Sequence, residues 1–562
     1  MVEFDETSRK KKVDELYKHE EEALVQLLAE KYGIPSIDLT VHAIEPDALK
    51  LIPEADARKI GVAAFAIKEH DVSLAILSPQ KEGVQILKEN LRNHGYIPSV
   101  YLTTKQSLEH AWDYYKDVSL ASRTKGGVLD IANQTIGELV QTIKSPEDIK
   151  KVVDEMLRDE KGHKVSKMLE IILAGAIGTG ASDVHIEPEE SNVKLRLRLD
   201  GVLHDIMFFD FDTFKLLNAR IKLLSGLKLN IKNDAQDGRF SIALSDTEVE
   251  IRASMLPGAY GESIVLRILN PDNISVSFTD LGIAKKLLTL LQNEIKKPKG
   301  LILTTGPTGS GKTTTLYSFL KEVHNPGVKI ITIEDPIEYH VTGITQTQTN
   351  DEKGYTFLQG LRSALRQDPD VIMIGEIRDA ETAKTAIDAA LTGHVVFSTL
   401  HTNSAAGAIP RLIDLEVNPK IISSALNVAI AQRLLRKICS NCKTTREANE
   451  REEKLFDAVI GELQTNGMED ALEGLTVSKP YIVGEGKGCA ICNNTGYKGR
   501  TGIYEAILMS GDIEAILDKN PSEREIEKAA LSQKIPTLRE DGVIKILAQM
   551  TTLEELERVV EV

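Results

Sequence analysis

Hydrophobic and polar positions follow three successive patterns along the chain. Near the amino terminus, apolar residues recur at helical spacing over residues 13–32, and Gly33-Ile34-Pro35 is typical of a helix end. Short apolar segments at 62–67 and 72–77 then alternate with helical stretches. This combination predicts a small α+β domain over residues 1–116.

A second pattern follows a polar stretch. Gly126-Gly127 and the polar residues around them predict a linker over residues 117–144. Apolar residues at 168–172 then indicate a buried helix face, and the segments 193–199 and 248–255 alternate as strands do. We expect a second α+β domain over residues 145–272.

After this domain the apolar strands no longer alternate with polar positions. The strands are expected at residues 300–305, 329–333, 371–374 and 395–399, with long helices between them. A strand that is apolar on both faces is typical of a parallel sheet covered by helices. The third pattern therefore predicts an α/β domain over residues 273–562.

Composition narrows the class of protein. A chain of 562 residues exceeds a single hydrophobic core, which stops growing at roughly 250 to 300 residues. We find no run of about 18 uncharged apolar residues, and the acidic start followed by lysines does not resemble a secretory signal, so a cytoplasmic location is expected. The net charge of −16 argues against a general nucleic-acid-binding protein.

A glycine-rich loop lies between the strand at 300–305 and the helix that follows it. In such a loop, backbone N–H groups surround phosphate oxygens, Lys312 reaches the terminal phosphates, and Thr313 holds magnesium. The alternative is a glycine-rich turn that matches by chance. The predicted ATP-binding residues are Gly306, Pro307, Thr308, Gly309, Ser310, Gly311, Lys312, Thr313 and Thr314.

Acidic and histidine side chains follow three other apolar strands. Glu334 is a candidate for polarising the attacking water, and Glu376 for orienting magnesium or water. Glu334 can also belong to a simple turn before Pro336, and the division of labour between the two carboxylates stays open. His394 and His401 stand at the two ends of the last strand, where they either sense the γ-phosphate or only satisfy backbone groups.

Four cysteines form two Cys-x-x-Cys pairs. Cys439, Cys442, Cys489 and Cys492 supply enough thiolates for a closed tetrahedral zinc site. The distance between the pairs exceeds the usual ribbon spacing of about 15 to 20 residues, and a redox dithiol is the alternative. We expect a zinc-binding insertion over residues 436–505.

These motifs resemble the ATPases of type II secretion and type IV pili, over roughly residues 15–550. The resemblance is carried by Gly306 to Thr313, Ile333-Glu334-Asp335-Pro336-Ile337-Glu338-Tyr339, Gly375-Glu376-Ile377-Arg378-Asp379 and Ser398-Thr399-Leu400-His401-Thr402-Asn403, with further segments at 180–188, 196–201 and 236–239. It implies a RecA-like ATPase domain preceded by a PAS-like α+β domain and a small amino-terminal docking domain. It also implies that Arg252 and Arg267 reach the nucleotide and that His401 belongs to the catalytic site.

The resemblance further implies a homo-hexamer that uses ATP, Mg²⁺ and Zn²⁺. Such a motor works at the cytoplasmic face of the inner membrane, through a platform protein and other components of the machinery. The pattern is closest to type IV pilus assembly ATPases, with type II secretion as the alternative. The Arg-Leu-Gly opening through which some relatives bind a cyclic dinucleotide is not found near this amino terminus. A nucleic-acid-translocating ATPase and a regulatory nucleotide-binding scaffold are hypotheses of other classes.

Overall fold

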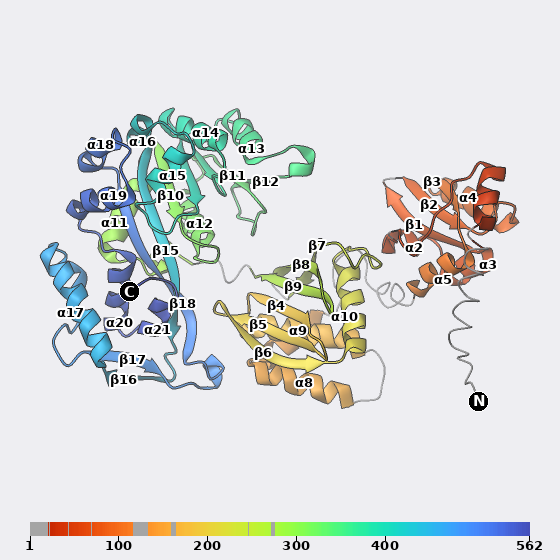
Figure 1. Cartoon of the computed structure of the whole chain (residues 1–562), viewed down its shortest axis with the longest axis horizontal. Helices are drawn as coiled ribbons and strands as arrows, with labels where there is room; N and C mark the ends of the chain where they lie inside the picture. Colours follow the sequence, from red (N-terminus) through yellow and green to blue (C-terminus); the bar gives the residue numbers. More distant parts are fainter. Residues whose placement is uncertain are drawn as a thin grey trace, which may run out of the picture. The chain divides into compact units, whose positions relative to one another are not determined.

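The computed structural model describes residues 21, 23–42, 44–68, 70–115, 133–158, 164–244, 247–270 and 276–562. The chain divides into two compact units, Met1–Asn270 and Pro271–Val562 (Figure 1). No helix within the described ranges combines the length and the apolar character that a bilayer crossing requires. Residues 13–20 of the first predicted helix and 117–132 of the predicted linker lie outside these ranges.

The first unit contains a small three-stranded sheet. Strand β2 lies between β1, which runs antiparallel to it, and β3, which runs parallel. The elements are α2 (Pro46–Lys50), α3 (Glu54–Ile60), β1 (Val62–Lys68), β2 (Asp71–Ile76), α4 (Glu82–Asn93), β3 (Ile97–Leu102) and α5 (Lys105–Asp113). Residues 23–32 are helical, and the Trp112 indole on α5 donates to the Val62 carbonyl at 2.9 Å.

A six-stranded antiparallel sheet follows in the same unit, with strand order β6-β5-β4-β9-β8-β7. Helix α9 carries apolar side chains on nearly every face, and its buried residues share one hydrophobic core with the strands of this sheet. The elements are α7 (Asn133–Thr142), α8 (Pro146–Arg158), α9 (Lys164–Thr179), β4 (Asp183–Pro188), β5 (Val193–Leu199), β6 (Val202–Phe209), α10 (Phe211–Leu224), β7 (Gln236–Ala243), β8 (Glu248–Gly258) and β9 (Gly261–Leu269).

The predicted linker is wrong over residues 133–144. This stretch contains α7, and its Ile136 and Ile143 are buried against α9. A Cβ at Gly178 of α9 would lie 2.4 Å from the Ile143 carbonyl, so the glycine permits a close approach of the two segments. The apolar positions of α7 have helical spacing, but they stand among polar residues, which are typical of a linker. Residues 133–144 therefore belong to the domain that follows.

The second unit is built on a seven-stranded sheet with strand order β12-β11-β13-β14-β10-β15-β18. All neighbouring pairs are parallel except the last, β15 with β18. The strands are β10 (Gly300–Thr305), β11 (Ile330–Glu334), β12 (Thr345–Gln348), β13 (Val371–Ile374), β14 (Val395–Leu400), β15 (Leu426–Ile438) and β18 (Tyr497–Leu508). The predicted α/β class is confirmed, with one antiparallel strand at the edge.

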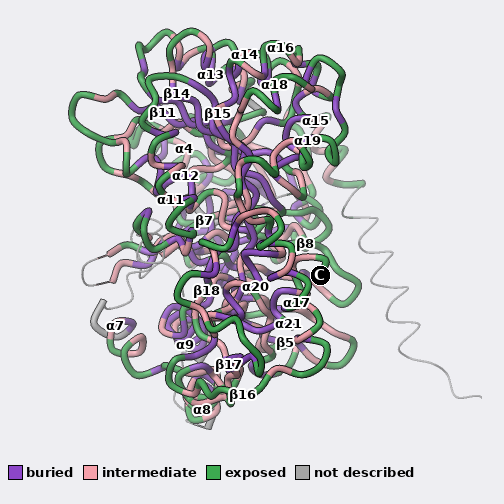
Figure 2. Tube along the Cα trace, turned by 90° about the vertical axis from the view of Figure 1, so that its left-hand side faces the viewer, coloured by how far each residue is buried: buried purple, intermediate pink, exposed green. Residues whose placement is uncertain are grey.

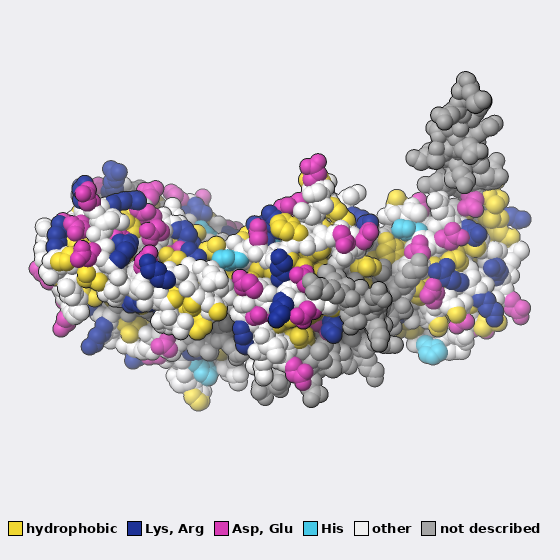
Figure 3. Space-filling view, turned by 90° about the horizontal axis from the view of Figure 1, so that it is seen from below, with side chains coloured by type: hydrophobic (Ala, Val, Ile, Leu, Met, Phe, Trp, Pro, Cys, Tyr) yellow, Lys and Arg dark blue, Asp and Glu magenta, His cyan; other side chains and the backbone are white. Residues whose placement is uncertain are grey.

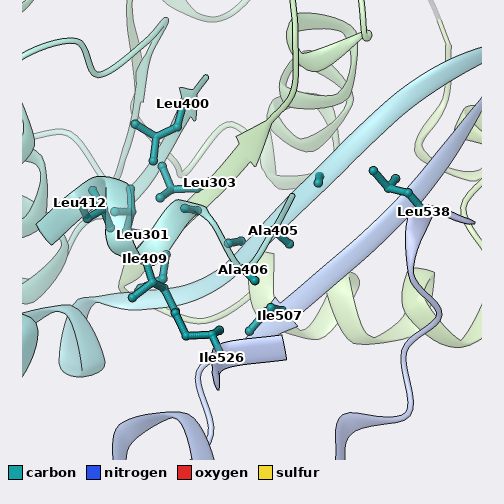
Figure 4. Packing of buried hydrophobic residues seen from close by; sticks show 14 of the residues in the cluster. Leu301, Leu303, Leu400, Ala405, Ala406, Ile409, Leu412, Ile507, Ile526 and Leu538 are labelled. Atoms are coloured by element: carbon teal, nitrogen blue, oxygen red, sulfur yellow. The ribbon is translucent and has the colours of Figure 1, made fainter. Parts of the chain in front are cut away.

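Helices cover both faces of this sheet. The helices are α11 (Lys285–Ile295), α12 (Lys312–Val323), α13 (Phe357–Leu365), α14 (Ala380–Leu391), α15 (Ala408–Asp414), α16 (Pro419–Ala425), α18 (Gly511–Leu517), α19 (Glu523–Ala530), α20 (Leu538–Leu547) and α21 (Leu553–Glu557). On one face, Leu301 and Leu303 of β10 lie near Leu412 and Ile409 of α15 (Figure 4). The central strands are buried and the connecting loops are exposed (Figure 2), as expected for apolar strands between helical layers.

A long excursion leaves the sheet between β15 and β18. It contains β16 (Lys443–Glu447), α17 (Glu450–Thr465), β17 (Ile482–Gly486) and the short helix η5 (Ala490–Cys492). Strands β16 and β17 pair antiparallel, and a capping box of Asn449 and Glu452 begins α17. On the face shown in Figure 3, acidic and basic side chains of the described residues are interspersed.

Candidate active site

Four sequence motifs lie at one edge of the seven-stranded sheet. Strands β10, β11, β13 and β14 are parallel, so their carboxyl ends point to the same side. The glycine-rich loop follows β10, Glu334 ends β11, Glu376 follows β13 and His401 follows β14. In open α/β sheets this edge is where ligands bind.

The glycine-rich loop, residues 306–313, passes directly into α12. Gly306 and Gly311 have φ values of +147° and +91°, which residues with a Cβ seldom adopt. The Ser310 hydroxyl is buried without a hydrogen-bond partner among the described residues, whereas Thr308 and Thr313 are exposed. A glycine-rich loop, the amino terminus of α12 and the Ser310 hydroxyl all offer hydrogen-bond donors at one place, an arrangement that fits a phosphate group.

The Lys312 ammonium lies over this loop. Its Nζ donates to the Gly306 carbonyl at 2.7 Å and to the Pro307 carbonyl at 3.0 Å. Burial, reinforced by the Arg433 guanidinium and opposed by the Glu376 carboxylate, lowers the pKa of Lys312 to about 8. Lys312 and Glu376, which the sequence singled out separately, therefore interact electrostatically.

Glu376 is the centre of a charged cluster. Its Oε2 lies 3.1 Å from His401 Nε2, and its Oε1 pairs with Arg378 Nε. Arg378 also reaches Asp335, with Nη1 3.5 Å from Oδ2. The Glu376 side chain is 15% exposed and His401 is 54% exposed, so the cluster is open to solvent on the histidine side. The Glu376 carboxylate and the Thr313 hydroxyl are oxygen ligands of the kind that Mg²⁺ takes.

Glu334 is placed differently, inside the protein. Its residue is only 3% exposed, and its carboxylate accepts hydrogen bonds from Tyr317 Oη of α12, Thr332 Oγ1 at 2.5 Å and Gln346 Nε2 at 3.1 Å. Burial and the Glu334 carboxylate raise the pKa of Tyr317 well above its ordinary range, so this hydroxyl stays protonated and donates. Both Glu334 oxygens are thus held by protein donors.

The loops after β10 and β14 are joined by a pair of threonines. Thr402 N donates to Thr305 Oγ1 at 2.8 Å, and Thr305 directly precedes Gly306, the first glycine of the glycine-rich loop. His394 lies at the amino end of β14, where its Nδ1 is 3.0 Å from the Ala389 carbonyl. Of the two histidines, only His401 lies at the carboxyl edge with the motifs.

Arg252 and Arg267 belong to the first unit, on neighbouring strands of the six-stranded sheet. They face each other directly in the β8–β9 pairing, and Arg239 is the next partner across β7. Arg267 Nε lies 3.2 Å from Asp183, which also pairs with Arg198 at 3.2 Å, and Arg252 Nε lies 3.2 Å from Glu250. Like charges opposite one another are unfavourable in a sheet, and the Glu250 and Asp183 carboxylates offset the two guanidinium charges here.

The four cysteines converge at the ends of the excursion. Their sulfurs all lie within 4.8 Å of one another, with separations of 3.9 Å for Cys439–Cys489 and 3.7 Å for Cys442–Cys492. Four sulfurs placed tetrahedrally at about 2.3 Å from a zinc ion are about 3.8 Å apart, whereas a disulfide needs about 2.05 Å. The cluster could therefore hold a metal, and its geometry fits zinc.

Sequence reasoning missed several residues around the site. Arg378 stood inside a quoted motif without a role, and Tyr317 and Gln346 carried no signal because their contacts depend on folding. Gln432 and Arg433 did carry a signal, since they interrupt an apolar run within residues 428–435.

Comparison with known proteins places the chain in a family. The family model described as "Type II/IV secretion system protein" matches residues 158–558. The type IV pilus assembly ATPase PilB of Myxococcus xanthus is 35% identical over 541 residues, which cover 96% of this chain and 91% of that protein. The type II secretion system protein E of Pseudomonas aeruginosa is 40% identical over 452 residues, covering 80% and 84%.

A solved structure agrees on the fold. The X-ray structure of the Legionella pneumophila ATPase DotB has a TM-score of 0.50 and 21% identity, and the match covers 72% of this chain and 97% of that one. Together, the parallel sheet, the loop and these matches define an ATPase of the P-loop class. The chain belongs to the type II/IV secretion system protein family, and the resemblance found in the sequence is confirmed.

Proposed function

We propose that this ATPase drives type IV pilus assembly, as a hexamer at the cytoplasmic face of the inner membrane. The proposal is supported by the match to the Myxococcus xanthus pilus assembly ATPase, which covers 96% of the chain and so includes both units; a type II secretion protein matches 92% of the chain, so this extent supports a motor of the family in either machinery. The first domain, residues 1–116, docks on a platform protein of the membrane or on other components of the machinery.

In the proposed site, Gly306 to Thr314 bind the phosphates of ATP. The Lys312 ammonium moves from the loop carbonyls to the terminal phosphates, and Thr313 and Glu376 hold Mg²⁺, which would neutralise phosphate charge when bound. Glu376 and His401 share a hydrogen bond at 3.1 Å and orient the attacking water. Glu334 is only 3% exposed and is held by donors inside the protein, so it acts on this water only if that network opens.

The remaining residues couple hydrolysis to movement. Arg252 and Arg267 lie on the first unit, and we propose that they contact nucleotide bound to a neighbouring subunit, where guanidinium groups stabilise phosphoryl charge. The four cysteines hold zinc and fix the ends of the excursion between β15 and β18.

The test of the nucleotide site is Lys312→Ala with Lys321→Ala as its control. Lys321 is exposed in the last turn of the same helix, so both variants lose one lysine from α12. We expect Lys312→Ala to weaken ATP binding by about tenfold or more and to abolish phosphate release, because a charge-assisted contact to phosphate is lost. Equal turnover in the two variants would refute the assignment of the site.

Type II secretion is the second candidate, favoured by the 40% identity to the Pseudomonas aeruginosa protein. Disrupting the gene in the source organism separates the two. Loss of surface pili with normal protein export supports the pilus motor, whereas export substrates retained in pilus-bearing cells support the secretion motor.

A further inference from the structure

A buried polar pair interrupts strand β15 beside the glycine-rich loop, residues 306–313, which is called the phosphate-binding loop from here on. Gln432 and Arg433 are only 1% and 7% exposed, and the residues around them, such as Ala431 and Leu435, are buried and apolar. Burying an amide and a guanidinium inside a strand is costly unless hydrogen bonds compensate. The partners of the pair therefore indicate why polar residues occupy these positions.

Gln432 holds one peptide of the loop. Its Nε2 donates to the Ser310 carbonyl at 2.7 Å, and its Oε1 has no hydrogen-bond partner within the described residues. In a trans peptide the carbonyl and the following N–H point in opposite directions. Because the Ser310 carbonyl is drawn toward Gln432, the N–H of Gly311 is directed away from β15, toward the phosphate side of the loop.

The contact between Gln432 and the loop leaves no room for a larger residue. A Cβ on Gly311 would lie 2.8 Å from Gln432 Nε2, and a Cβ on Gly306 would lie 2.8 Å from the Gln432 carbonyl and 2.9 Å from Arg433 Nη1. The pair thus packs against the first and the last glycine of the loop. Both ends of the loop are fixed from the same strand.

Arg433 extends this bracing to the loop that carries His401. Its Nη1 donates to the Gln432 carbonyl at 2.9 Å, and its Nη2 donates to the Asn403 carbonyl at 2.8 Å. Asn403 is two residues after His401. One planar guanidinium therefore connects β15, beside the phosphate-binding loop, with the histidine loop, a geometry that a lysine ammonium does not reproduce.

We propose that Gln432 and Arg433 are positioning residues of the ATPase. Gln432 orients the Ser310–Gly311 peptide before nucleotide arrives, so that the Gly311 N–H contributes to phosphate binding without reorganisation. Arg433 holds the loop that carries His401 and Asn403 in a fixed position relative to the phosphate-binding loop. The proposal rests on the nucleotide site proposed above.

Gln432→Met removes the donor and keeps a side chain of similar length. Its control is Asn427→Met on the same strand, because Asn427 Nδ2 donates to the Lys299 carbonyl at the far end of β15. Binding of a fluorescent ADP analogue is titrated for both variants. We expect the Kd of Gln432→Met to rise about tenfold and that of Asn427→Met to stay within about twofold of the wild type.

A purely structural role predicts a different result. Both variants would then unfold at lower temperature, with an unchanged Kd for the folded fraction, and this outcome overturns the assignment of Gln432. If Gln432→Met does not fold, Gln432→Glu is the second variant, because it keeps the shape of the side chain but replaces the Nε2 donor with an oxygen that cannot donate to the Ser310 carbonyl. We expect the same rise in Kd for this variant.

Arg433→Lys tests the second residue, because it keeps the charge but cannot reach both carbonyls. We expect kcat to fall about tenfold while the Kd of ADP changes less, since the histidine loop rather than the phosphate contact is disturbed. Wild-type kcat in Arg433→Lys overturns the bridging role. Lys312→Ala is measured alongside: if it binds ADP normally the nucleotide site itself is wrong, whereas weak binding there with normal binding in Gln432→Met removes only this proposal.

Discussion

Tyr317→Phe removes a hydroxyl that donates to the buried Glu334 carboxylate and also accepts from Gln346 Nε2 at 3.2 Å. The Tyr317 side chain is fully buried, and its hydroxyl donates to a carboxylate that is itself 3% exposed. A hydrogen bond to a charged group contributes about 1.5–3 kcal/mol, and Glu334 keeps the donors Thr332 and Gln346 in the variant. We therefore expect a loss of about 2 kcal/mol in the second unit, which for a domain of this size lowers Tm by about 4 °C.

The chain offers a matched control and an internal reference. Tyr339 stacks on Tyr317 with a ring-centroid distance of 4.2 Å, but its hydroxyl is buried without a hydrogen-bond partner among the described residues. Tyr339→Phe therefore removes the same atom without removing a hydrogen bond. The single tryptophan, Trp112, lies in the first unit, so its fluorescence follows that unit, while calorimetry follows the whole chain.

We expect Tyr317→Phe to lower the calorimetric transition of the second unit while the Trp112 transition stays in place. Equal Tm values for Tyr317→Phe and Tyr339→Phe would refute the contribution of the Tyr317–Glu334 bond. The turnover of the folded Tyr317→Phe protein then shows whether a firmly held Glu334 carboxylate matters for hydrolysis.

Three further predictions concern the other parts of the site. Glu376→Gln should still bind ATP but hydrolyse it about a hundredfold more slowly, because a neutral amide is a weaker Mg²⁺ ligand and a weaker acceptor for the attacking water than a carboxylate; normal steady-state turnover would move the water-orienting role to Glu334. Metal analysis of the purified protein should find about one zinc per chain, and stripping it with a chelator should lower the Tm of the second unit; an unchanged Tm in metal-free protein would contradict a structural role. Mixing Arg267→Ala with Lys312→Ala subunits should restore part of the turnover, since about a quarter of the shared sites are then complete, whereas inactive mixed rings would indicate self-contained sites.

The sequence predicted four of the seven strands of the large sheet because their signal is local, whereas β12, β15 and β18 were not predicted. Four apolar segments became β10, β11, β13 and β14 almost to the residue, and parallel pairing then brought the motifs to one edge. Helix α7 was not predicted because Gly126-Gly127 and the polar residues after them are typical of a linker, and the burial of Ile136 and Ile143 depends on contact with α9. Helical spacing within a polar stretch was the available signal.

The side-chain contacts could not be predicted in the same way. Glu334 reads as a strand-end acid in the sequence, yet Gln346 and Tyr317, which hold it, come from β12 and α12. Gln432 reaches Ser310 across 122 positions of sequence. Such partners are set by which strands become neighbours, a property of the whole sheet rather than of any local pattern.

The pairing of β15 with β18 determines what would happen if the cysteine-bearing excursion were cut out. Ile438 and Tyr497 are partners across these strands, so the chain departs and returns at adjacent points, and a short hairpin turn could join them. Excision would nevertheless uncover apolar surface, because Phe456 and Leu463 of α17 belong to the same core as Val543 and Ile546 of α20. A shortened protein would need polar replacements on α20 to remain free of aggregation.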